Sequence, residues 1–352
     1  MDEDGAVSSE EAPKPGPLHL ARPVPADATL EERLEAYEDL IDSEVGDTSE
    51  SRARHLERET GLRQLYLKFE GGNPTGTQKD RIAFAQAMDA MRRNFDAITV
   101  ATCGNYGVAM ALAARLARLR CKILIPAGYH TGRAREMEAQ GAEILRTPGD
   151  YEAAVEASRR LAEENEYYDA NPGGANEGLQ LRAYGQIASE IYDTLRDAPV
   201  VVAVPVSNGS TLAGIYRGFL SLYRRGKTSR LPRMVAGSSY RKNPIIQAFE
   251  KDLDHCPDLE PGSIRETQVN EPLINWHSID GDLALQAIRA TGGWASHVSD
   301  RAMTRAARTL REEEGLNVLP AATAGLAALF AGHRQEPLTG DRYVAVLTGR
   351  RR

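Results

Sequence analysis

Short apolar runs alternate with longer helix-like segments along most of this chain. The runs are the expected strands, and they cover residues 64–70, 97–102, 121–126, 142–147, 200–206 and 342–348. The segments expected to be helices are 80–94, 105–119, 132–140, 151–165 and 211–225. Strands that alternate with helices predict parallel sheets joined by crossover helices. Because most of the runs are continuously apolar, helices are expected on both faces of each sheet, in an α/β fold.

The length of 352 residues suits two domains. We expect each domain to be a mostly parallel, twisted sheet covered by helices, with an N-terminal domain over 30–184 and a C-terminal domain over 185–352. The preceding segment, 1–29, is acidic and rich in proline, so it is predicted to be a disordered tail.

Charge and cysteine content narrow the class of protein. A formal net charge of -7 argues against a nucleic-acid partner, which favours a basic surface. The three cysteines, Cys103, Cys121 and Cys256, are too few for a disulfide framework, so we expect a reducing, cytoplasmic location. No apolar run reaches membrane-spanning length, and the seven histidines lack ligand spacing, so neither a membrane contact nor a metal site is predicted.

Polar, glycine-rich loops follow three of the predicted strands. They read EGGNPTGTQKDR at 70–81, ATCGNYG at 101–107 and VSNGSTLAG at 206–214. In parallel sheets ligands bind at the carboxyl ends of the strands. A loop of this composition that opens a helix presents free backbone N–H groups to an anion. Each loop alone is more often a simple turn, but together the last two predict two anion sites, beside the lysine of the first.

Lys79 stands at the start of a predicted helix, where the helix dipole disfavours a cation. Only seven of the 43 lysine and arginine residues are lysines, so its presence beside this loop is informative. The ordinary alternative is a solvated surface lysine. An amine forms a Schiff base, whereas a guanidinium stays protonated and does not. Lys79 is therefore a candidate to hold pyridoxal 5′-phosphate.

EGGNPTGTQKDR resembles the pattern E-x-x-N-P-T-G-S-x-K-D-R of pyridoxal-phosphate enzymes of the tryptophan-synthase β fold, also called fold type II. Within that family the chain most strongly resembles threonine synthase. The resemblance runs from about Val45 to Gly349 and includes ATCGNYGVA, VPVSNGSTLAG, VLPAATAGLAAL and VLTGR. It implies a cofactor held in a cleft between two α/β domains. We expect the segment 110–165 to be mobile and to close over the substrate.

The resemblance also implies a role for individual residues. Lys79 would hold the cofactor and act as acid and base, Asn105 would bind the 3′-hydroxyl group of the cofactor, and Thr348 would face the pyridine nitrogen. The cofactor phosphate would lie against the backbone amides of Ser207, Asn208, Gly209, Ser210 and Thr211. The substrate carboxylate would be ringed by Thr102, Cys103, Gly104 and Tyr106. Simpler roles stay open, with Asn105 as a helix cap and Cys103 as a small buried group.

The chain departs from the threonine-synthase pattern where those enzymes bind the substrate phosphate. Asp169, in YYDANPGGANEG at 167–178, stands where the family places a serine. A carboxylate would repel a phosphate, so we predict that Asp169 lines the substrate pocket and disfavours a phosphorylated substrate. The alternative is that Asp169 stabilises the turn before Asn171 and Pro172.

Three functions follow from these observations. The first is a threonine-synthase-like lyase that eliminates and replaces groups on an amino-acid side chain. The second is a β-replacement synthase, or a serine or threonine dehydratase, with a substrate that lacks phosphate. The third is a binding protein without catalysis, against which Lys79, Asn105 and Thr348 argue. The expected partner is a small amino acid, and the expected assembly is a homodimer.

Overall fold

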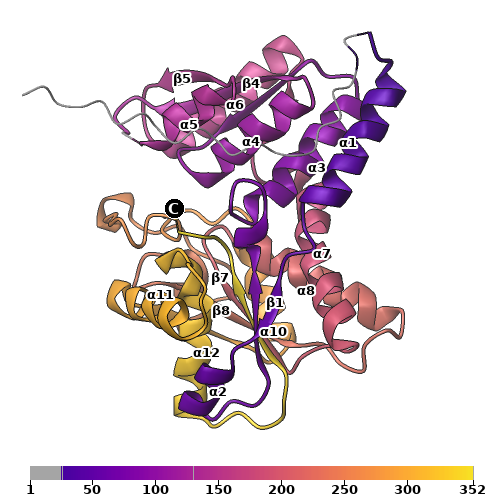
Figure 1. Ribbon diagram of the computed structural model, residues 1–352. Helices are drawn as coiled ribbons and strands as arrows, with labels where there is room; N and C mark the ends of the chain where they lie inside the picture. The colour runs from indigo at the N-terminus through magenta and orange to yellow at the C-terminus, as the bar shows by residue number, and fades with distance from the viewer. Residues whose placement is uncertain (1–24, 26, 130, 352) are drawn as a thin grey trace, which may run out of the picture.

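The computed structural model describes residue 25, residues 27–129 and residues 131–351, and Figure 1 shows how they are arranged. Most of the tail predicted to be disordered, 1–29, lies outside the described residues. The described chain forms two sheets covered by helices, one in the upper part of Figure 1 and one in the lower part. Within these residues no helix is both long enough and apolar enough to cross a membrane.

The smaller sheet has four parallel strands in the order β5-β4-β3-β6. Its strands are β3 (Ala97–Ala101), β4 (Arg120–Pro126), β5 (Glu143–Thr147) and β6 (Tyr168–Asp169). The helices around it are α1 (Leu30–Glu44), α3 (Lys79–Arg92), α4 (Asn105–Leu116), α5 (Arg133–Ala139) and α6 (Tyr151–Asn165). Helix α6 packs on β3 and β4, while α4 packs between α3 and α5 and also contacts both strands. The central strand β3 is therefore buried along its whole length.

The larger sheet has six strands in the order β1-β2-β10-β7-β8-β9, and only the β1–β2 pair is antiparallel. Its strands are β1 (Glu50–Arg52), β2 (Leu65–Phe69), β7 (Val201–Pro205), β8 (Arg233–Ser239), β9 (Trp294–Val298) and β10 (Tyr343–Leu347). The remaining helices are α2 (Arg54–Thr60), α7 (Glu177–Leu195), α8 (Ser210–Arg224), α9 (Pro244–Glu250), α10 (Gly281–Ala290), α11 (Asp300–Glu313) and α12 (Ala324–Gln335). Short 3-10 turns complete the chain at Glu70–Gly72, Gly174–Asn176, Pro261–Ser263 and Pro320–Thr323.

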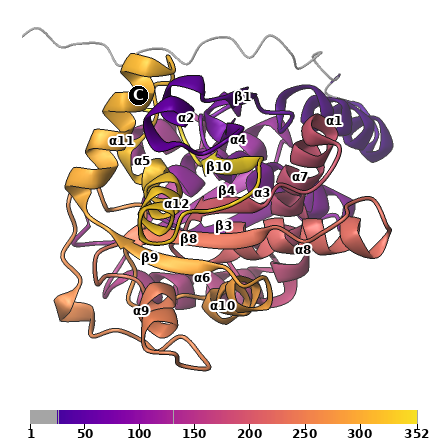
Figure 2. The ribbon, with the colours of Figure 1, turned by 90° about the horizontal axis from the view of Figure 1, so that it is seen from below.

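Both faces of the larger sheet are covered, as Figure 2 shows for β8 and β9 between α12 and α10. Along β7 the side chains alternate between two cores. Val202 and Val204 pack in the core that includes α8 and α10, and Val201 and Ala203 pack in the core that includes α12. A strand buried on both faces explains the continuous apolar run in the sequence. The predicted α/β fold of two mostly parallel sheets is confirmed.

The two sheets do not divide the chain where the sequence predicted. Strands β1 and β2 lie in the larger sheet, although the division at 184/185 placed them in the N-terminal domain. The reason is the pairing of β2 with β10 from the other end of the chain, with Leu65 opposite Tyr343. Helix α7 then runs between the two parts and packs on both α3 and α8. The smaller sheet and helices α3 to α6 are thus inserted between β2 and β7, whereas α1 precedes β2 in the chain.

Candidate active site

Lys79 is the first residue of α3, and its amine lies between two aromatic rings. The Nζ atom donates to the hydroxyl of Tyr184 at 3.3 Å. It also lies 5.8 Å from the ring centre of Tyr184 and 5.9 Å from that of Tyr106. The loop before Lys79 contacts the end of β10, where the N–H of Gln78 donates to the carbonyl of Thr348 at 3.1 Å. Residues from opposite ends of the chain therefore meet at this lysine.

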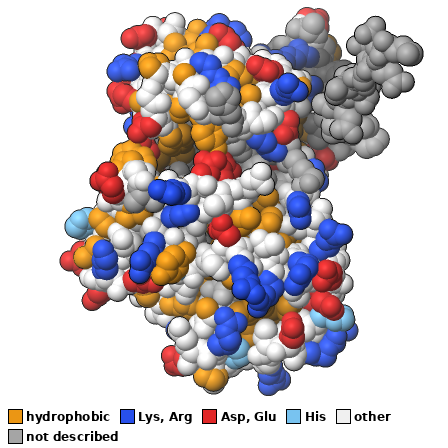
Figure 3. Space-filling view, turned by 90° about the vertical axis from the view of Figure 1, so that its left-hand side faces the viewer, with side chains coloured by type: hydrophobic (Ala, Val, Ile, Leu, Met, Phe, Trp, Pro, Cys, Tyr) orange, Lys and Arg blue, Asp and Glu red, His pale blue; other side chains and the backbone are white. Residues whose placement is uncertain are grey.

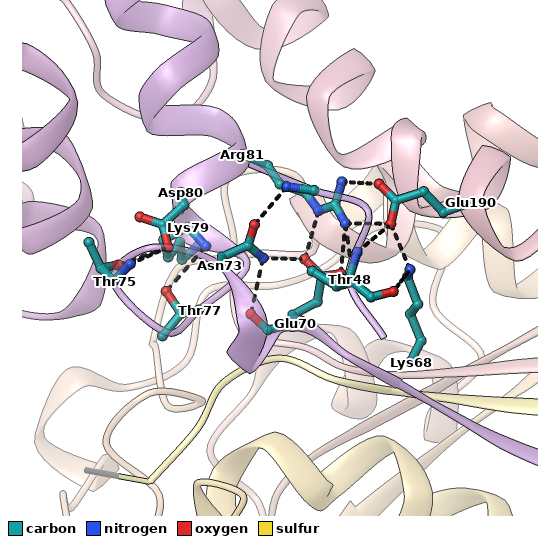
Figure 4. Close-up of polar contacts among 11 residues, drawn as sticks. Thr48, Lys68, Glu70, Asn73, Thr75, Thr77, Lys79, Asp80, Arg81 and Glu190 are labelled. Atoms are coloured by element: carbon teal, nitrogen blue, oxygen red, sulfur yellow. Dashed lines mark hydrogen bonds and ion pairs between the residues drawn. The ribbon is translucent and has the colours of Figure 1, made fainter. Parts of the chain in front are cut away.

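A buried ion-pair network supports the Lys79 loop from behind, as Figure 4 shows. The Arg81 guanidinium contacts Glu70 and Glu190, each at 2.6 Å, and the Arg81 and Glu70 side chains are fully buried. Lys68 from β2 contacts Glu190 at 2.6 Å. Buried charges are tolerated when they are paired in this way. Burial opposes the charge of Glu190, but hydrogen bonds and charges from Arg81 and Lys68 outweigh it and lower the pKa of Glu190 to about 2.

Asp80 ties the loop to the start of the helix. One carboxylate oxygen accepts from the N–H of Thr75 at 2.9 Å and from its hydroxyl at 3.0 Å. The other oxygen is buried without a hydrogen-bond partner among the described residues. Burial raises the pKa of Asp80 to about 7, although the Thr75 and Thr77 hydrogen bonds oppose the shift. The carboxyl next to Lys79 therefore titrates near neutral pH.

The loop between β3 and α4 lies opposite the lysine. The Tyr106 hydroxyl donates to the carbonyl of Ala170 at 2.6 Å and accepts from Gln86, so only its ring faces Lys79. The Asn105 side-chain oxygen accepts from the Arg133 guanidinium at 2.7 Å. Burial raises the pKa of Cys103 to about 12, so this thiol stays protonated. Cys103 therefore lines the cavity as a neutral thiol.

Two asparagine side chains hold the loop between β7 and α8 by hydrogen bonds to its oxygen atoms. Asn243 donates to the carbonyl of Ser207 at 2.9 Å, and Asn275 donates to the side-chain oxygen of Asn208 at 2.9 Å. Gly209 has φ +94°, and a Cβ atom there would lie 2.6 Å from the carbonyl oxygen of Asp280. Only glycine fits this position. The first N–H groups of α8 have no partner within the helix, so they are available to an anion.

These three loops and Thr348 enclose one cavity of about 620 Å³. Its wall includes nearly all the residues predicted for the site, namely Lys79, Thr102, Cys103, Gly104, Asn105, Tyr106, Ser207, Asn208, Gly209, Ser210, Thr211 and Thr348. Residues of both sheets contribute, because β3 and β7 end at the cavity. The structure therefore brings together the segments that the sequence singled out.

Asp169 is the exception, and the structure places it outside the cavity wall. Its carboxylate accepts from the N–H of Asn171 at 2.9 Å and from the side-chain amide of Asn171 at 2.6 Å. Arg159 lies 3.9 Å away on the other side. A carboxylate that binds the amide two residues later stabilises a turn. The geometry corrects the prediction of a substrate contact in favour of the turn.

The sequence did not reveal the acidic part of the cavity wall. The Tyr129 hydroxyl lies 3.2 Å from a carboxylate oxygen of Glu266 and 3.4 Å from one of Glu271. Burial and the neighbouring Glu266 raise the pKa of Glu271. Asp150 and Glu152 also line the cavity, whereas the wall formed by the described residues includes no arginine. Acidic side chains are visible where the upper and lower parts of the molecule meet (Figure 3). No motif in the sequence marks these residues.

The family model of the pyridoxal-phosphate dependent enzymes matches residues 41–349. The chain belongs to this family. It is 30% identical over 307 residues to threonine synthase from Methanocaldococcus jannaschii, covering 86% of this chain and 74% of the relative. It is 32% identical over 287 residues to threonine synthase from Synechocystis, covering 81% of this chain and 71% of the relative. The solved structure of maize serine racemase superposes with a TM-score of 0.74 at 18% identity, covering 91% of this chain and 94% of that chain.

The residues of this pyridoxal-phosphate enzyme fit its cofactor. An aldehyde needs an amine, and Lys79 presents one in the cavity. A phosphate needs backbone donors. Gly209, at φ +94°, lies directly before α8, and the first N–H groups of this helix supply such donors. The resemblance seen in the sequence, its fold and its cofactor are therefore confirmed.

Proposed function

We propose that this enzyme is a threonine-synthase-like lyase that removes and replaces a group on the side chain of an amino acid. The observation that carries the proposal is the single cavity in which Lys79 faces two loops that open helices. Threonine synthases at 30% and 32% identity support it. The half-buried Lys79 amine and the neutral thiol of Cys103 in the same cavity suit chemistry on an amino acid.

In this proposal Lys79 attaches to the cofactor, the loop 207–211 holds its phosphate, and Asn105 and Thr348 contact its ring. Pyridoxal phosphate, when bound, supplies an electron sink for charge at the α-carbon of the substrate. The hydroxyl of Thr348 is neutral and does not keep the pyridine nitrogen protonated. A weaker electron sink favours loss of a side-chain group over transamination.

Lys79 would move the proton at the α-carbon. Tyr184 holds its Nζ atom at 3.3 Å, which limits the positions the amine can adopt. The N–H groups that open α4 at Asn105 and Tyr106 would bind the substrate carboxylate, since the first donors of a helix have no partner within it. The rings of Tyr106 and Tyr184 would exclude water from the reacting atoms.

The acidic wall favours a second candidate, a β-replacement or dehydratase reaction on a substrate without phosphate. Glu266 and Glu271 lie next to Tyr129, and the positive charge of Arg133 offsets the charge of Glu271 only in part, since the pKa of Glu271 is raised on balance. Two like charges 4 Å apart repel by about 1 kcal/mol in water and about 4 kcal/mol near a protein surface. Glu266 and Glu271, rather than Asp169, are therefore the carboxylates expected to repel a substrate phosphate.

A panel of amino acids tests both candidates. The purified enzyme would be mixed with O-phosphohomoserine, L-serine and L-threonine, while the cofactor absorbance and the released products are measured. We expect uncharged substrates to change the spectrum and to be turned over, and the Glu271→Gln variant to improve any response to O-phosphohomoserine. Efficient conversion of O-phosphohomoserine by the wild type would refute the second candidate. If no substrate changed the cofactor absorbance or released a product, both candidates would be refuted.

A further inference from the structure

Asp280 lies directly behind the loop 207–211 and contacts three consecutive residues of it. Its N–H donates to the carbonyl of Asn208 at 3.0 Å. Its own carbonyl oxygen leaves no room for a Cβ atom at Gly209. Its carboxylate accepts a hydrogen bond from the hydroxyl of Ser210. Asp280 therefore shapes the part of the loop that opens α8.

The carboxylate of Asp280 is only half satisfied. The residue is 2% exposed, and its Oδ1 atom has no hydrogen-bond partner among the described residues. A buried carboxylate in this state is costly when ionised. Burial raises the pKa of Asp280; the Ser210 hydrogen bond opposes the shift, Glu177 of α7 adds to it, and Lys79 of α3 opposes it.

Two other titratable groups lie near the start of α10, where Asp280 is situated. A Cβ atom at Gly281 would lie 3.0 Å from the Cys256 sulfur, and burial raises the pKa of Cys256 to about 12, so this thiol stays neutral. The carboxylate of Asp282 is exposed and accepts from the N–H of Cys256 at 2.7 Å. Neither group offers a partner to the free oxygen of Asp280.

The Ser210 hydroxyl has a single hydrogen, which it donates to one acceptor at a time. When Asp280 is ionised, that hydrogen points to the carboxylate, and Ser210 turns lone pairs toward the anion site. When Asp280 is protonated, its O–H donates to Ser210, and the serine hydrogen is free for the anion. The charge behind the loop disappears in the same step.

We propose that Asp280 is a proton-linked positioning residue, which takes up one proton from solvent when the cofactor phosphate binds to the loop 207–211. The inference rests on the assignment of that loop under the proposed function, and it does not depend on which reaction the enzyme catalyses. It predicts that affinity for a phosphate monoester falls as the pH rises through the titration of Asp280.

The test compares wild type with Asp280→Asn, because an amide donates to Ser210 as the protonated acid does. Equilibrium dialysis of the full-length protein would give dissociation constants for pyridoxal phosphate, and for pyridoxal as a matched ligand without phosphate, between pH 5 and pH 9. For each pH we compare the dissociation constant of wild type with that of Asp280→Asn. For pyridoxal phosphate, the ratio of the wild-type to the variant dissociation constant should rise by up to about tenfold per pH unit, because binding is linked to the uptake of one proton. For pyridoxal the ratio should stay constant.

A constant ratio for pyridoxal phosphate, or an equal rise for both ligands, would overturn the inference. Equal affinity for the two ligands in wild type would overturn the phosphate assignment itself, and the inference with it. Ser210→Ala gives an independent check if Asp280→Asn folds poorly. Losing this hydroxyl should weaken binding of pyridoxal phosphate more at low pH than at high pH. An equal loss at every pH would count against the coupling of Ser210 to Asp280.

Discussion

At the scale of single residues, the site depends on ionisable groups placed next to Lys79 but outside the reacting atoms. Asp80 is the nearest in sequence, and it is fully buried. Its two hydrogen bonds to Thr75 fix the turn before the lysine. Its free oxygen makes the ionised form costly. The same carboxyl therefore orders the loop and makes its stability depend on pH.

Asp80→Asn should remove part of this pH dependence. The folded pKa of Asp80, about 7, lies above its ordinary value, so its contribution to stability is present at low pH and is lost as the pH rises toward 7. Between pH 5 and pH 8 the free energy of unfolding of wild type should fall by roughly 2–3 kcal/mol more than that of the variant. Denaturant unfolding at both pH values measures the difference. An equal fall in the free energy of unfolding in both proteins would contradict this prediction. Glu50, whose pKa burial raises to about 7, is present in both proteins and so does not affect the comparison.

At the scale of elements, α3 is joined to β2 and α7 by the charges that surround Arg81. Glu70 follows β2, and Glu190 lies on α7. Both carboxylates depend on Arg81, with Lys68 as a second cation for Glu190. Breaking a buried pair leaves an uncompensated charge, which costs far more than an exposed pair contributes.

Arg81→Met should lower the free energy of unfolding by about 3–5 kcal/mol, because Glu70 loses its counter-ion and Glu190 loses one of its two. The matched control is Arg92→Met on the same helix, where the pair with Glu38 spans 3.6 Å and both side chains are exposed. This control should change the free energy by less than about 1 kcal/mol. Denaturant unfolding followed by fluorescence compares the two variants. Similar values for both would show that the network contributes little.

The sequence predicted the helices that follow the site loops better than the elements around them. Helix α4 begins at Asn105 as expected, and α8 begins at Ser210, one residue earlier than expected. No element was assigned between 166 and 199, where the structure has β6 and α7, or between 226 and 341, where it has β8, β9 and α9 to α12. Small residues conceal β8, because Gly237 lies so close to the start of α12 that a Cβ atom would meet the Ala324 carbonyl. Such contacts between distant segments leave no local pattern.

At the scale of the whole molecule, one side of the cavity depends on segments that are far apart in the sequence. Strand β10 pairs with β2, and Thr77 pairs with Gly349, which brings Thr348 beside the lysine loop. The sequence identified the three loops as a set, although each loop alone is more often a simple turn. The acidic residues Glu266 and Glu271 come from a long connection without regular strands, so only the folded chain shows that they face the same cavity. Closure by the segment 110–165 stays a prediction.

The most direct test of the proposed site is the identity of the residue that holds the cofactor. Borohydride reduction of the holoprotein, which traps a cofactor–lysine linkage, would be followed by peptide mapping with mass spectrometry. We predict that the label is on Lys79, and that Lys79→Arg removes it while cofactor still binds through the loop 207–211. A label on Lys68 or Lys122, or a wild-type protein without label, would contradict the assignment of Lys79.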